Sequence, residues 1–182
     1  MKKNKLETYI AFVAIIACAV FMRLIPHIPN ITPIGALALF SGMTVPSLWA
    51  IAIPFVSMGI SDAFLGFHLT LPYVYGSFAL IVGMGYLIRK KMSPLRVGGV
   101  SLVGSVLFFL ITNFGVWATG TMYAKNASGL LESYVMGLPF FRNTLVGDLF
   151  FNILFYVGFR LLFFLSKKVV LFVSRLSDYY LS

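Results

Sequence analysis

Polar side chains that could bind a ligand are scarce in this sequence, and they gather in a few short stretches. The first stretch, RLIPHIPNITPIGALAL at residues 23–39, places Arg23, His27 and Asn30 among three prolines. Proline fixes the backbone φ angle and has no N–H to donate. A plain connector needs only a turn, so this stretch is typical of a segment that holds a shape and offers hydrogen-bonding groups.

The other candidates follow or precede long apolar runs. Asp62 and His68 lie between two such runs, Asn113 ends the run SVLFFLITN, and Asp148 stands inside another apolar run. The whole candidate set for substrate binding comprises Arg23, His27, Asn30, Asp62, His68, Asn113, Trp117, Tyr123, Arg142, Asn143 and Asp148. Each signal is weak alone, and it is their shared location on the outer side of the predicted membrane topology that makes these residues candidates.

Several of these residues also have a structural interpretation that stays open. Trp117 and Tyr123 could belong to the belt of aromatic residues at the level of the lipid headgroups. Asn143 could cap a helix, and Asp148 could pair with an arginine. Isolated histidines more often make structural hydrogen bonds than bind metals.

Motifs for catalysis and for cofactor binding are absent from the sequence. G-x-S-x-G, H-E-x-x-H, the phosphate-binding P-loop and the Gly-rich dinucleotide fingerprint do not occur. A single cysteine, Cys18, excludes an intramolecular disulfide and a cysteine metal cage. We therefore expect no enzyme activity, no catalytic residues, no metal, no cofactor and no energy source within this chain.

Composition places the protein in a membrane. Only 10% of its 182 residues are charged and 60% are hydrophobic, whereas about a quarter of the residues of soluble proteins are charged. The apolar runs cover residues 8–22, 31–61, 69–88, 97–124 and 143–159. Since about 20 apolar residues cross the ~30 Å hydrocarbon layer, the sequence predicts one all-α, polytopic transmembrane domain over residues 1–182.

The basic residues indicate orientation rather than a nucleic-acid partner. They form three clusters: KKNK at 2–5, RKKMSPLR at 89–96, and Lys167, Lys168 and Arg175 near the end. Short basic flanks stay on the cytoplasmic side. The first two clusters share one side only if residues 31–61 form two short spans, and SGMTVPS at 41–47 supplies the turn between them.

The sequence therefore predicts six transmembrane helices with both termini in the cytoplasm. The expected helices lie near 8–24, 32–43, 46–61, 71–88, 97–115 and 144–165, followed by a short amphipathic cytoplasmic tail at 166–182. Residues 113–143 are expected to form an ordered outer loop that closes over a pocket. Cys18 also follows a lipoprotein-like start, but cleavage there would delete most of the first span, so we expect this helix to be kept.

Three segments resemble a known group of proteins. RLIPHIPNITPIGALALFSG, GSVLFFLITNFGVWATGTMY and GLLESYVMGLPFFRNTLVGDLFFN are similar to a family of uncharacterised bacterial membrane proteins, itself similar to the substrate-binding S components of energy-coupling factor (ECF) transporters. The resemblance covers roughly residues 18 to 160. It implies the bacterial inner (cytoplasmic) membrane, a pocket near the outer face, and capture of a vitamin or related micronutrient for uptake. It also implies a transmembrane coupling subunit with two ATPases as partner.

Two other classes of function stay open. A membrane-embedded enzyme could use His27, His68 and Asp148 at the outer surface, and a structural or assembly subunit would use its helices only for protein contacts.

S components often carry small residues four apart on the first helix, where they dock on the coupling subunit. The best match here is Ala14 and Cys18, and such pairs are common in membrane helices.

Overall fold

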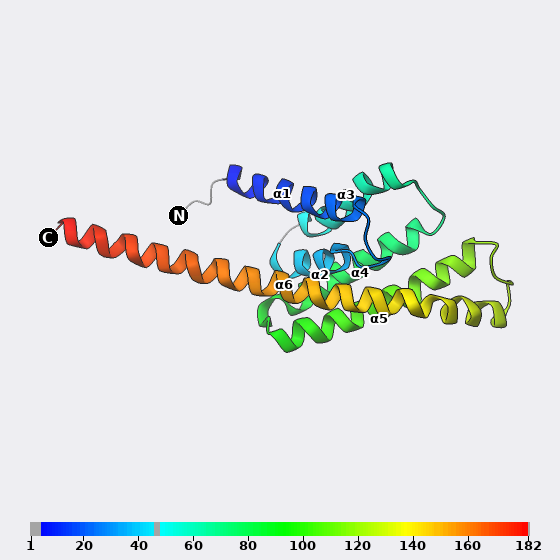
Figure 1. The fold of residues 1–182 in the computed structure, drawn as a ribbon. Helices are drawn as coiled ribbons and strands as arrows, with labels where there is room; N and C mark the ends of the chain where they lie inside the picture. Colours follow the sequence, from blue (N-terminus) through cyan, green and yellow to red (C-terminus); the bar gives the residue numbers. More distant parts are fainter. Residues whose placement is uncertain (1–4, 46–47, 182) are drawn as a thin grey trace.

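The computed structural model describes the backbone of residues 5–45 and 48–181, and the side chains of residues 13–45, 48–161 and 164. In these ranges the chain is helical and contains no strand (Figure 1). Its elements are α1 (Lys5–Leu24), α2 (Ile34–Thr44), α3 (Trp49–Leu65), α4 (Leu71–Ile88), the 3-10 turn η1 (Arg89–Lys91), α5 (Pro94–Thr119) and α6 (Ala127–Leu181).

Successive helices run in opposite directions through the molecule (Figure 1). The beginning of α1, the turn between α4 and α5, and the far part of α6 lie on the left in that view. The turn carries Arg89, Lys90 and Lys91, and we call this side the basic end. The connections 25–33, 66–70 and 120–126 lie at the opposite side, which we call the loop end.

The short helix α2 is the centre of the fold. Eight of its 11 residues are buried, and it contacts α3, α4, α5 and α6. Its sequence, IGALALFSGMT, is apolar or small on every face, which is typical of a helix surrounded by others. At 1.5 Å per residue it is about 16 Å long, so it cannot cross the ~30 Å hydrocarbon layer alone.

Two glycines bring α2 and α4 into backbone contact. A β-carbon on Gly42 would overlap the carbonyl of Val82, and a β-carbon on Gly85 would overlap the carbonyl of Leu39. Membrane helices pack through small residues in this way. Lipid tails are as apolar as the side chains, so helix association gains no hydrophobic free energy and depends on close van der Waals contact.

Among the described residues, three segments are long and apolar enough to cross a membrane: Leu71–Lys91, Pro94–Thr119 and Ala127–Leu161. Large apolar side chains point outward along these helices, with Leu87 81%, Val103 55% and Leu154 52% exposed. A soluble protein of this size rarely exposes so continuous an apolar surface. The fold is that of a helical membrane protein.

Most of the predicted helices are found close to their expected positions. The helix at 71–88 has the expected bounds, and residues 31–61 are divided between α2 and α3 as the charge pattern required. That all six helices cross the membrane, with both termini inside, stays a prediction.

The prediction of a long loop at 113–143 is wrong. α5 continues to Thr119 and α6 begins at Ala127, so only residues 120–126 lie outside a helix. Ser133 and Gly137, which resemble loop residues in the sequence, are small residues that pack α6 against α5. The Ser133 hydroxyl donates to the carbonyl of Asn113, and a β-carbon on Gly137 would overlap the Asn113 side chain.

The end of α6 also differs from the expected helix at 144–165 with a separate tail. The helix runs without a break to Leu181, and Asn143 lies inside it rather than at its cap. The amphipathic character predicted for 166–182 lies outside the residues whose side chains are described.

Candidate functional site

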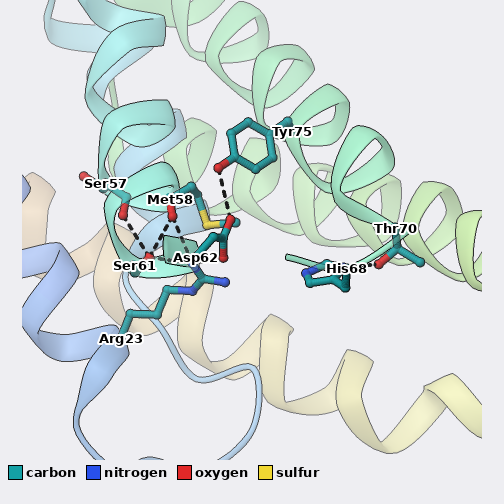
Figure 2. A network of polar contacts seen from close by, with 8 residues as sticks. All are labelled: Arg23, Ser57, Met58, Ser61, Asp62, His68, Thr70 and Tyr75. Carbon is teal, nitrogen blue, oxygen red and sulfur yellow. Dashed lines mark hydrogen bonds and ion pairs between the residues drawn. The ribbon is translucent and has the colours of Figure 1, made fainter. Parts of the chain in front are cut away.

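Arg23, Asp62 and Tyr75 join three helices near the loop end (Figure 2). Arg23 lies in the last turn of α1, and its Nη1 is 2.6 Å from Oδ1 of Asp62 near the end of α3. The Tyr75 hydroxyl of α4 donates to the other carboxylate oxygen at 3.0 Å. We call these three residues, with Ser61, the Arg23 cluster.

The Arg23 cluster compensates its buried charge internally. The Asp62 side chain is 1% exposed and that of Arg23 is 16% exposed. The same Arg23 nitrogen also donates to the Ser61 hydroxyl and to the carbonyl of Met58. Each carboxylate oxygen therefore has a partner, and the cluster anchors α1 and α4 on α3.

A second polar group lies deeper, between α5 and α6. Ser101 and Ser105 are four residues apart on α5, and Asp148 and Asn152 are four residues apart on α6, so each pair shares one helix face. The Ser105 hydroxyl donates to Asp148 Oδ2 at 2.8 Å. Asn152 Nδ2 donates to the Ser101 oxygen at 2.9 Å. We call these four residues the Asp148 cluster.

The Asp148 cluster is buried, and its charge is not compensated by a basic residue. Asp148 is 6% exposed and Asn152 is 2% exposed. Within the described side chains, the ion pair between Arg23 and Asp62 is the only one formed, and the Oδ1 atom of Asn152 accepts no hydrogen bond. Unpaired polar groups at such depth are costly, so they mark functional sites by default.

A glycine on α2 makes room for the carboxylate. A β-carbon on Gly35 would overlap Oδ1 of Asp148. Gly35 is in the first turn of α2, so the carboxylate fits against the backbone there only because this residue has no side chain.

A small cavity separates the Asp148 cluster from the loop between α1 and α2. Its volume is about 40 Å³, which at roughly 15 Å³ per water molecule holds two or three waters. Its lining consists of Asn30, Thr32, Gly35, Phe78, Phe108, Thr144 and Asp148. A narrower crevice continues deeper, along Gly35, Leu39, Ile81, Ser101, Gly104, Asp148 and Asn152.

The loop that covers the cavity is fastened to α6 by two side-chain amides. Asn30 Nδ2 donates to the Thr144 hydroxyl at 3.3 Å, and Asn143 Nδ2 donates to the carbonyl of Pro29 at 3.0 Å. Asn30 has a φ of 64°, a left-handed conformation that asparagine tolerates better than most residues. We call residues 25–33 with these two bonds the strap.

Two predicted site residues, Asn30 and Asp148, thus line one cavity, and a third, Asn143, lies beside it. Asn143 contributes by holding the strap. Five polar residues that sequence reasoning missed complete this region: Thr32, Ser101, Ser105, Thr144 and Asn152. The four-residue spacing of Ser101 with Ser105, and of Asp148 with Asn152, was the pattern that could have revealed the Asp148 cluster.

The connection between α5 and α6 has its own contacts. Trp117 Nε1 donates to the carbonyl of Ala124 at 2.9 Å. Lys125 Nζ donates to the carbonyls of Gly120 and Trp117, and it lies 5.7 Å from the centre of the Trp117 ring. A cation there satisfies carbonyls at the C-terminal end of α5 and suits the helix dipole. Tyr123 is half-buried in the same short connection.

The remaining candidates make local contacts or point to the surface. Asn113 Nδ2 donates to the carbonyl of Phe109 within α5, and Arg142 is exposed on α6. His27 and His68 are exposed, and their Nδ1 atoms contact the Ile25 carbonyl and the Thr70 hydroxyl. Among the described residues, no three His, Cys, Asp or Glu side chains gather as metal ligands would.

The fold and the two clusters define a helical membrane protein with buried polar groups and a covered cavity between its helices. Within that class, the chain belongs to DUF6580, described as a family of unknown function, which matches residues 2–172. No curated protein and no solved structure matches the chain.

Proposed function

We propose that this protein is the substrate-binding subunit of an uptake system, similar to the S components of ECF transporters. It captures a vitamin or related micronutrient from outside the cell and depends on a separate ATP-driven module. The observation that carries the proposal is the cavity beneath the strap, where polar side chains of the loop and of α6 converge in an otherwise apolar bundle.

Charge supports an outward position for the cavity. The basic residues Arg89, Lys90, Lys91 and Arg96 lie in and beside the turn at the basic end, and such residues stay in the cytoplasm. The strap lies at the opposite end. In this orientation the cavity opens toward the outside, where a nutrient arrives.

The chemistry of the wall favours a flat, ring-containing solute. Phe78 and Phe108 stack with ring centres 5.2 Å apart, and an aromatic wall of this kind packs well against a heterocycle. Asn30, Thr32 and Thr144 offer amide and hydroxyl groups, and Asp148 offers a carboxylate. A solute with N–H donors is therefore preferred.

The cavity must enlarge to admit such a solute. Pockets for small organic ligands usually measure about 300–1,000 Å³, whereas this one measures about 40 Å³. Opening the strap breaks the bonds of Asn30 and Asn143, each of which contributes roughly 0.5–1.5 kcal/mol. We infer that the structure represents a closed form of the cavity, and that a modest free energy opens it.

Energy for release into the cell must come from a partner, since the chain has no phosphate-binding loop. The partner is a transmembrane coupling subunit with two ATPases. We assign this contact to α1, because α1 packs mainly on α3 and leaves Val13, Cys18 and Phe21 exposed.

Uptake of labelled micronutrients in cells tests the proposal. Cells that express the protein together with a coupling module should accumulate one labelled vitamin above the level of cells with either component alone. Asp148→Asn should reduce this uptake, and the exposed His68→Ala should not. Accumulation of no vitamin from a complete panel, with the protein present in the membrane, would reject the proposal.

A further inference from the structure

We propose that the Asp148 cluster binds one monovalent metal cation of the size of Na⁺, between α2, α5 and α6. This inference goes beyond the proposed function: it concerns an ion site within the helix bundle, which shares Asp148 with the cavity and is tested below without any solute.

The first argument is charge. A buried carboxylate without a positive partner is costly, and the two buried acids of this protein differ in this respect. Asp62 has Arg23 at 2.6 Å. Asp148 has the neutral hydroxyl of Ser105 as its hydrogen-bond donor, and no described basic side chain pairs with it. A cation beside Asp148 would supply the missing charge.

The second argument is the supply of oxygen ligands. Oδ1 of Asn152 is buried and has no donor, and it lines the same crevice as Asp148 and Ser101. The Ser101 and Ser105 oxygens keep lone pairs beyond the bonds they make. Carboxylate, amide and hydroxyl oxygens are the ligands that hard cations prefer.

The charge balance selects a monovalent ion. The cluster contains one carboxylate, and its other members are neutral, so a single positive charge leaves the buried site neutral. A divalent ion would leave an uncompensated positive charge at the same depth. The crevice is narrower than a water molecule, and a dehydrated Na⁺ is smaller than water. The neighbouring cavity, which shares Gly35 and Asp148 with the crevice, gives a path from the loop end.

A proton is the competing way to neutralise Asp148. It would remove the charge and add one O–H donor, which serves a single acceptor, whereas a cation is ligated by several oxygens at once, including Asn152 Oδ1, which has no hydrogen-bond partner. A cation satisfies both Asp148 and Asn152, which is why we favour it.

Binding of ²²Na⁺ to the purified protein in detergent, with choline as the replacement cation and no solute added, tests the site. The wild type should bind about one ion per chain and should unfold at a higher temperature in NaCl than in choline chloride. Asn152→Ala should weaken binding roughly tenfold, the effect of losing one oxygen ligand. Asp148→Asn should abolish it. Glu132→Gln, at an exposed acid of α6, is the matched control and should bind like the wild type.

Three results would overturn the cation site. One is equal thermal stability of the wild type in NaCl and choline chloride without ²²Na⁺ binding. A second is a stability that follows pH but not Na⁺, which would assign the neutralising role to a proton. A third is wild-type affinity in a folded Asn152→Ala variant. Should Asn152→Ala fail to fold, Ser101→Ala provides the same comparison.

Discussion

Breaking the ion pair between Arg23 and Asp62 should destabilise the protein by about 3–5 kcal/mol, the usual cost of leaving one buried charge unpaired. The structure predicts which of the two single variants loses more stability. Arg23→Met leaves a carboxylate that is 1% exposed and, among the described side chains, keeps only Tyr75 as a partner, so its cost should lie near the upper limit. Asp62→Leu leaves a guanidinium that is 16% exposed and keeps the Ser61 hydroxyl and the Met58 carbonyl. Its cost should lie near the lower limit.

The double variant Arg23→Met with Asp62→Leu distinguishes an ion pair from two independent contributions. Removing both charges leaves neither unpaired, so the double variant should recover most of the loss, as in other buried pairs replaced by apolar residues. Unfolding with SDS in mixed micelles, followed by far-UV circular dichroism, gives the free energies. Arg142→Met, at an exposed arginine of α6, is the control and should stay within about 0.5 kcal/mol of the wild type.

The reasoning is refuted if Arg23→Met costs less than about 1 kcal/mol, which is the range of pairs exposed to water. It is also refuted if the costs of the two single variants simply add in the double variant. Either result would mean that Arg23 and Asp62 do not hold the helices together. Both residues would then again be candidates for solute binding.

Three further predictions test the packing, the orientation and the strap. Gly85→Ala should lower the free energy of unfolding by about 1–3 kcal/mol, because the added β-carbon meets the α2 backbone. In the same unfolding assay Gly83→Ala should be neutral, because its β-carbon meets no atom within 4 Å. Equal effects of the two variants would contradict the close contact between α2 and α4. Cysteines placed at Lys125 and Ser93 should react with an impermeant maleimide from outside and inside the cell respectively, and labelling from one side would reject the assigned orientation. Asn143→Ala should speed amide hydrogen exchange in residues 25–33 about fivefold, the effect of losing a bond worth ~1 kcal/mol, and unchanged exchange would show that the strap is held otherwise.

The helices could be predicted well where apolar runs end at clear turns. α4 has the expected bounds because Pro72 favours a helix start at its first turn and basic residues follow its apolar run. The long loop expected between Asn113 and Asn143 was an error of interpretation. Ser133 and Gly137 favour loops when read singly, but at a four-residue interval they form the face on which α6 packs against α5.

The site could be predicted from the sequence less well than the helices. Asp148 stood out as an acid in an apolar run, yet the partners of an acid depend on how two helices align. The sequence suggested an arginine for it, and the structure gives it Ser105. Arg23 pairs instead with Asp62, 39 positions further along the chain. The alignment of α5 with α6, and of α1 with α3, comes from packing that no local pattern encodes.

Native mass spectrometry of the purified protein tests the central claim, capture of a small solute beneath the strap, most directly. Protein from cells that also make the coupling module, purified without adding any solute, should carry a fraction of chains with one bound molecule in the mass range of a vitamin. Thr144→Leu, which fills the cavity, should lose that molecule, while His68→Ala should retain it. Wild-type protein that carries lipid alone, even after incubation with a complete panel of vitamins, would contradict the account, as would an equal occupancy in the Thr144→Leu variant.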